Sequence, residues 1–195
     1  MKRLPLYFFL IFFTLPTPSQ ADDIQDFQIE GMSIGDSLLD YISESEINNN
    51  KGKGQFKINK FMYVDMDKLK SLEIYSALRV WIKPEDNNYK IYSVEGNIFY
   101  DNKINDCYKN QKEIVDELTE LFNDKNVQKF EGEEEKHRLD KSGKSTFIAT
   151  YFTFKSGEAA QITCTDWSKE LKWIDQLSVA IDSKEYGDFL QNEAF

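Results

Sequence analysis

The sequence predicts an α+β protein in which helices cover an antiparallel sheet, arranged as two tandem units of one helix and three strands. A segment with helical spacing of apolar residues precedes three strand-like runs, and the same order begins again about 75 residues later. Helices and strands that each carry one apolar face can bury it by packing against each other. The two units span residues 31–100 and 106–183. The alternative is a single α+β domain over residues 22–195 in which the repetition is accidental.

The first unit opens with a predicted helix after Gly31-Met32-Ser33. Ser33 is a favourable N-cap residue, and Asp36 supports the first turn electrostatically. Four apolar residues then recur at helical spacing: Ile34, Leu38, Tyr41 and Ile42. The spacing Ser43-x-x-Glu46 is that of a capping box and predicts a second short helical turn. Residues 48–54 are rich in Asn, Lys and Gly and predict a loop.

Three strand-like runs complete the first unit, at residues 58–65, 74–82 and 89–100. The middle run alternates, so that Leu78, Val80 and Ile82 share one face while Arg79 and Trp81 lie on the other. Residues 84–88 form the turn before the third run.

The second unit begins with a helix that is capped by Asn105 or Asp106 and extends to Phe122, with Gln111 as the one polar residue on its apolar face. Residues 123–145 are polar and charged and predict a long exposed loop. Three strands are predicted at residues 146–154, 159–166 and 176–182, and a terminal helix at residues 184–195. Ser156-Gly157 is the expected hairpin turn between the first two of these strands.

Residues 1–21 resemble a secretory signal peptide. Lys2 and Arg3 give a basic start, residues 4–15 are almost entirely apolar, and Ser19-Gln20-Ala21 supplies small residues for cleavage. The apolar run is too short to span a bilayer. We therefore expect a mature chain that begins at Asp22 and is exported, to the periplasm or the extracellular space.

The mature chain is strongly acidic. The whole chain has 24 basic and 34 acidic residues, and the leader contains two of the bases and none of the acids. Such a charge repels nucleic acid and anionic lipid, so neither is an expected partner. No later run is long and apolar enough for a transmembrane segment, and no cysteine follows the leader as a bacterial lipid anchor would require.

Cys107 and Cys164 are the two cysteines of the chain. In an oxidising compartment two cysteines usually pair, and a C-x-x-C redox spacing is absent. We expect a disulfide that ties the second helix to the penultimate strand.

The Gly31-Met32-Ser33 opening, followed by an amphipathic turn and antiparallel strands, resembles small envelope proteins of the SmpA/BamE outer-membrane assembly type. The tandem arrangement is similar to the β-lactamase-inhibitor-like fold. Both resemblances imply a protein that binds another envelope protein through its sheet or loops and has no catalytic residues. In those lipoproteins a lipidated cysteine follows the signal, whereas Asp22 stands here. The chain is also similar to small exported bacterial proteins rich in Asn, Lys, Ile and Phe.

Three features suggest chemistry but do not form a motif. The Gly143-Lys144-Ser145-Thr146 sequence lacks the earlier glycine of a P-loop and precedes a strand, whereas a P-loop follows one. His137 is the only histidine and lies in the most charged segment, where we expect it to be solvated. Residues 131–135 cluster carboxylates without the ligand spacing of a calcium loop. We therefore predict no catalytic residues, no metal site and no cofactor.

The three tryptophans are the predicted binding residues. Trp167 and Trp173 lie in a strand connection beside Lys169 and Lys172, and Trp81 points away from the apolar face of its strand. Exposed aromatic side chains in loops are frequent contact residues for proteins or glycans. The alternative is that these rings cap the open end of the core.

The sequence thus predicts an exported, disulfide-bonded, non-catalytic module that binds a protein partner in the bacterial envelope. The alternative is a small-ligand carrier or a small secreted hydrolase with a pocket between the helices and the sheet.

Overall fold

The computed structural model describes residues 24, 27–67, 72–101, 103–122 and 127–195. The predicted signal peptide, residues 1–21, lies outside the described residues. Within the described part of the chain, no helix combines the length and apolar character needed to cross a membrane.

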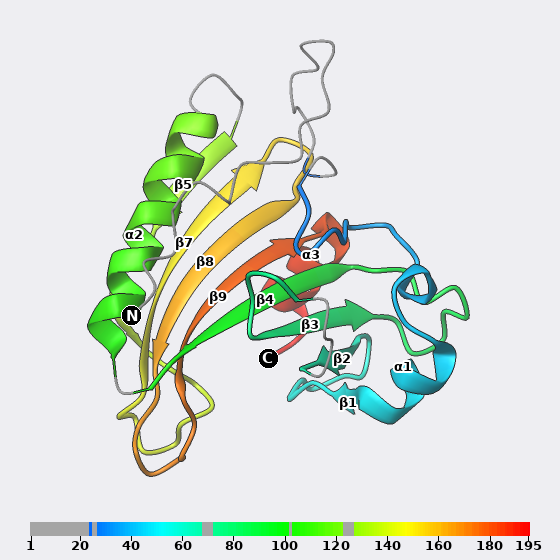
Figure 1. The fold of residues 1–195 in the computed structure, drawn as a ribbon, viewed down its shortest axis with the longest axis horizontal. Coiled ribbons are helices and arrows are strands. Elements are labelled where there is room, and N and C mark those ends of the chain that lie inside the picture. Colours follow the sequence, from blue (N-terminus) through cyan, green and yellow to red (C-terminus); the bar gives the residue numbers. More distant parts are fainter. Residues whose placement is uncertain (1–23, 25–26, 68–71, 102, 123–126) are drawn as a thin grey trace.

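Nine strands of the described residues form one antiparallel sheet. In spatial order its main path is β1 (Lys51–Lys53), β2 (Met62–Met66), β3 (Ala77–Ile82), β4 (Ser93–Tyr100), β9 (Asp175–Asp182), β8 (Ala159–Asp166), β7 (Thr146–Phe154) and β5 (Val127–Glu131). The short β6 (Glu135–Lys136) also pairs with β7, next to its first residues. The sheet is strongly twisted, so that β2 and β3 run across the direction of β7 and β8 (Figure 1).

The predicted α+β fold, in which helices cover an antiparallel sheet in two tandem helix-plus-three-strand units, is wrong. Residues 31–100 contribute four strands and residues 106–183 contribute five, and β4 pairs with β9 from Ser93↔Asp182 to Tyr100↔Asp175. Each of these strands would otherwise present an edge of unpaired backbone groups, and their pairing satisfies both edges. The chain therefore forms one continuous sheet, with more strand than helix.

The first predicted helix is also absent. Residues 31–42 contain only one 3-10 turn, Leu38–Asp40, because Gly31 and Gly35 have positive φ values of 80° and 97°. The backbone instead pairs with a distant segment: the Gly35 N–H donates to the Ile91 carbonyl at 2.9 Å. Tertiary hydrogen bonding thus overrides the helical spacing of the apolar residues.

The other helix predictions agree better with the structure. The predicted capping box forms at Ser43 and Glu46 and starts α1 (Glu44–Asn50), which extends into the expected loop. The helix α2 (Ile104–Leu121) and the terminal helix α3 (Lys184–Asn192) lie in the predicted segments. The predicted cap at Asn105 or Asp106 is wrong, because α2 begins at Ile104 after Lys103, whose side chain makes no capping hydrogen bond. Gln111, the polar residue on the buried face of α2, donates to the Ile148 and Ile162 carbonyls at 2.8 and 3.0 Å, and so joins α2 to β7 and β8.

The predicted exposed loop at residues 123–145 is partly wrong, because β5 and β6 lie within it. β5 pairs with the second half of β7, from Val127↔Phe154 to Glu131↔Thr150. The strand was not evident from the sequence, because its residues are mostly polar or charged and exposed. Its backbone hydrogen bonds come from the neighbouring strand β7.

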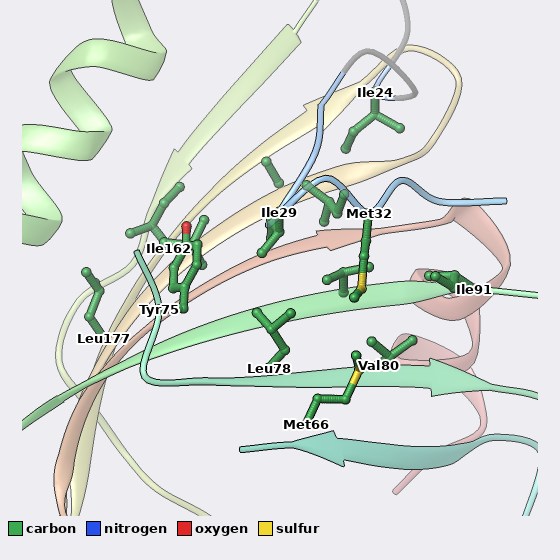
Figure 2. Close-up of a cluster of buried hydrophobic side chains, with 14 of the residues drawn as sticks. Ile24, Ile29, Met32, Met66, Tyr75, Leu78, Val80, Ile91, Ile162 and Leu177 are labelled. Atoms are coloured by element: carbon green, nitrogen blue, oxygen red, sulfur yellow. The ribbon is translucent and has the colours of Figure 1, made fainter. Parts of the chain in front are cut away.

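The two faces of the sheet are covered differently, with α2 and α3 on opposite sides (Figure 1). On the α2 face a large apolar core includes the predicted inward residues Leu78, Val80 and Ile82. Figure 2 shows Ile24, Ile29 and Met32 of the N-terminal segment lying over this face of the sheet. This segment occupies the place that the first predicted helix was expected to fill.

The predicted disulfide is confirmed. Cys107 at the start of α2 bonds to Cys164 of β8, with their Cα atoms 6.0 Å apart, and both side chains are fully buried. The bridge fixes α2 to the centre of the sheet.

On the opposite face α3 packs in a smaller aromatic cluster, made of Phe61, Trp81, Tyr186, Phe189 and Ala194. This cluster covers only the part of the face near β2 and β3. An open cleft lies over the remainder of that face, on β4, β9 and β8.

Candidate ligand-binding cleft

An open cleft of about 780 Å³ lies on the α3 face of the sheet. Alternate residues of β4, β9 and β8 form its floor. Its walls come from residues 53–56, from α3 with the C-terminal residue Phe195, and from two loops at residues 137–139 and 172–174. A cavity of this volume is in the range of small-molecule binding sites.

All three predicted binding residues, Trp81, Trp167 and Trp173, line this cleft. Trp81 is nearly buried and stacks at 5.4 Å on Tyr186 of α3. Trp167 and Trp173 pack edge to face at 4.6 Å, and Trp173 keeps 47% of its surface exposed. The sequence could not place these rings together, because Trp81 is separated from the other two by more than 80 residues of chain. Whether they bind a ligand stays a prediction.

The cleft floor is polar. Strand alternation presents amide, hydroxyl and carboxylate side chains there: Ser93, Glu95, Gln161, Thr163, Thr165, Gln176, Ser178 and Asp182. Several of them are already hydrogen-bonded to each other. Gln161 donates to the Thr163 hydroxyl at 2.8 Å, Gln176 donates to the Ser178 hydroxyl at 3.2 Å, and the Ser178 hydroxyl lies 2.9 Å from a carboxylate oxygen of Glu95. The floor groups are thus held in place before any ligand binds.

Asp182 is a buried carboxyl group at the end of β9. Desolvation raises its pKa to about 7, with a further contribution from the charge of Glu95, while a hydrogen bond with Ser93 acts in the opposite direction. This carboxyl therefore keeps its proton to a higher pH than an exposed aspartic acid does.

Three cations border the cleft without an ion pair among the described residues: Lys53, Arg138 and Lys172. The Arg138 guanidinium stacks on the ring of Phe195 at 3.2 Å. Arg79, which also lines the cleft, is neutralised by a two-point ion pair with Asp65 at 2.7 and 3.0 Å. The border of the cleft is thus basic on a protein whose overall charge is acidic.

Asp140 connects the two loops that border the cleft. Its carboxylate accepts hydrogen bonds from the Ser142 N–H at 2.8 Å, the Ser145 N–H at 3.0 Å and the Ser145 hydroxyl at 2.7 Å. The Ser145 hydroxyl in turn accepts from the Ser168 N–H at 2.8 Å. These hydrogen bonds hold the pKa of Asp140 well below its usual range. The Gly143-Lys144-Ser145-Thr146 sequence is therefore part of a hydrogen-bonded turn that leads into β7.

His137 is not the solvated residue that the sequence suggested. Its ring lies 4.3 Å from that of Trp167 and 5.7 Å from that of Phe147, and its Nδ1 accepts from the Leu139 N–H at 3.3 Å. Burial lowers the pKa of His137, so the neutral form is favoured. In this position it supports Trp167 at the cleft wall.

The described residues contain no group of three or more His, Cys, Asp and Glu side chains arranged to hold a metal ion. The acidic residues of segment 131–135 lie at the end of β5, at the start of β6 and between these strands. Glu135 lines a second cavity, next to the cleft.

Sequence reasoning missed several cleft residues, among them Asp182, Glu95, Arg138 and Phe195. The alternation of polar residues in β8 and β9 was a signal for a polar sheet face. It could not show that α3 and the two loops enclose that face, because enclosure depends on contacts between distant segments.

No protein-family model, no characterised protein and no solved structure matches this chain. The resemblance to SmpA/BamE-type proteins stays a prediction.

Proposed function

We propose that this protein is an exported, non-catalytic binding protein whose ligand occupies the cleft on the α3 face. The observation that carries the proposal is the cavity itself: about 780 Å³, with all three tryptophans of the chain in its lining. Binding sites of this kind combine apolar and aromatic walls with a few placed polar groups. The Cys107–Cys164 disulfide supports export, because such bonds persist in oxidising compartments.

The tryptophans provide the test. Since every tryptophan of the chain lines the cleft, tryptophan fluorescence, excited selectively over that of the ten tyrosines, reports on this site. The probe is 8-anilinonaphthalene-1-sulfonate, whose aromatic rings and sulfonate suit the aromatic walls and basic border. We expect saturable energy transfer from tryptophan to the bound probe.

Trp173→Ala should weaken probe binding about tenfold, the effect of losing roughly 1.4 kcal/mol of contact energy. The matched control is Leu39→Ala, since Leu39 is 44% exposed and lies outside the cleft. Equal probe binding by wild type and Trp173→Ala would contradict the proposal.

A protein partner from the envelope is the occupant that the sequence predicted. Affinity capture with residues 22–195 from native envelope extract tests it, with a Trp167→Ala, Trp173→Ala double variant as the control. A polypeptide retained by wild type and lost with the variant would identify a protein as the ligand.

Hydrolysis is a second candidate, and one observation favours it. Asp182 has a pKa of about 7 and shares the cleft with Glu95. A carboxylic acid that stays partly protonated at neutral pH can act as a general acid. Mass spectrometry of ester, glycoside and peptide substrates after incubation tests this, and any turnover should disappear in Asp182→Asn.

A further inference from the structure

The cleft has a polar surface and an aromatic surface, and a ligand that fills it contacts both. Its floor is a row of hydroxyl, amide and carboxylate groups on β8, β9 and β4. Exposed rings border this floor: Phe99 at the end of β4 at 44%, and Trp173 and Phe195 of the walls at 47% and 43% exposure. The ligand therefore needs a polar edge and an apolar face on the same body.

The polar floor excludes a purely apolar ligand. Gln161 and Gln176 each use one N–H within the floor, which leaves a second donor and the carbonyl oxygen for a ligand. An acyl chain would cover these groups without replacing their hydrogen bonds to water, which is unfavourable for each polar group left unsatisfied.

The charges exclude a compact polyanion at the floor. Glu95 and Asp182 lie there, and the protein as a whole has a net charge of −10. The three cations without ion pairs lie at the border, where they can bind an acidic substituent while the body of the ligand contacts the floor.

A second cavity of about 690 Å³ adjoins the first and shares with it the floor residues Gln161, Thr163 and Asp182. Arg138 and Phe195, which stack on each other at 3.2 Å, line both cavities. The shared floor thus continues past this stacked pair, which favours an elongated ligand over a single small ring.

We infer that the cleft binds an oligosaccharide. Pyranose rings present hydroxyl groups that donate and accept hydrogen bonds at their edges, and C–H groups on their faces that pack against aromatic rings. A chain of several sugars would contact the polar floor with its hydroxyl edges and the exposed rings with its faces, and would extend from the first cavity into the second. This inference rests on the proposed function, since it names the ligand class of the same cleft.

The test is isothermal titration calorimetry together with tryptophan fluorescence on the disulfide-bonded protein. The probes are the monosaccharide, trisaccharide and hexasaccharide of N-acetylglucosamine, glucose (β-1,4 and α-1,4) and galacturonic acid. We expect one series to bind, with the hexasaccharide at least tenfold tighter than the monosaccharide, because only the longer chain reaches both cavities.

Two variants separate the contributions of wall and floor. Trp173→Ala should weaken binding of that series about tenfold, and Gln176→Ala about fivefold, whereas Leu39→Ala should leave it unchanged. Phe195→Ala should reduce the advantage of the hexasaccharide over the trisaccharide.

The outcomes distinguish the two proposals. If no oligosaccharide of the panel binds at millimolar concentration while 8-anilinonaphthalene-1-sulfonate still binds in a Trp173-dependent way, the carbohydrate inference is overturned and the binding cleft stands. If neither the sugars nor the probe binds, both fail. A captured polypeptide that depends on Trp167 and Trp173, without sugar binding, also overturns the inference.

Discussion

At the scale of single residues, the most unusual group is the Asp182 carboxyl. Its side chain is nearly buried, and no cation forms an ion pair with it within the described residues. Burial therefore raises its pKa to about 7, from an ordinary value of 3.8. Such a group weakens the native state whenever it is ionised.

Asp182→Asn should make this cost measurable. In wild type the folded state holds the proton more tightly than the unfolded state, so this group's contribution to stability is largest below about pH 4 and is lost as pH rises to about 7. The asparagine variant does not ionise. We expect it to be more stable than wild type at pH 8, by about 3–4 kcal/mol, and close to wild type at pH 4.

Urea unfolding at pH 4, 6 and 8 provides the measurement. The matched control is Asp67→Asn, because Asp67 is exposed and lies outside both cavities. A stability difference that does not change with pH would show that the carboxyl is not buried as described.

At the scale of elements, α2 and β8 are joined by a covalent bond and by the hydrogen bonds of Gln111. The disulfide closes a loop between residues that are 57 positions apart. Both attachments lie on the face opposite the cleft. The structure thus separates the element that stabilises the sheet from the surface that we propose for binding.

Replacing both cysteines by alanine should lower the free energy of unfolding by about 4 kcal/mol, the chain-entropy value for a loop of this length. Probe binding by the fraction that remains folded should persist, because neither cysteine lines the cleft. Differential scanning calorimetry of wild type and variant, each with and without reductant, tests this. Reductant should lower the stability of wild type and leave that of the double alanine variant unchanged. If reductant also destabilised the double alanine variant, the stability difference could not be assigned to the disulfide.

At the scale of the whole molecule, the β4–β9 pairing makes one sheet of two halves of the chain. Eight residue pairs connect these strands, and the apolar core on the α2 face includes side chains from both halves. Two tandem units would unfold separately if their interface were weak, whereas one continuous sheet and core should unfold together.

We therefore expect a single calorimetric transition with equal calorimetric and van't Hoff enthalpies. Amide hydrogen exchange should give β4, β9 and β8 the strongest protection, since these strands lie in the middle of the sheet. Two resolved transitions, or weak protection along β4, would show that the halves are independent units.

The sequence by itself determined the local features of this protein. The capping box at Ser43, the helix of residues 104–121, the Ser156-Gly157 turn and the two strands beside it depend on interactions between near neighbours in the chain. The facing of Trp81 away from Val80 follows in the same way from the two-residue period of a strand. The disulfide followed from there being two cysteines in a predicted exported chain.

Only the tertiary structure decided the rest. The pairing of β4 with β9, the strand β5 within a charged segment, and the loss of the first predicted helix all depend on distant backbone partners or on glycines with positive φ. The partners are 19 to 27 residues away for β5 and more than 50 residues away for the other two. The cleft also depends on tertiary structure. The sequence identified each of its tryptophans as a candidate binding residue, but the cavity forms only where the strands, α3 and the two loops come together. Local propensity does not specify these tertiary contacts, because they are stabilised by burial and by hydrogen bonds between segments that are distant in the sequence.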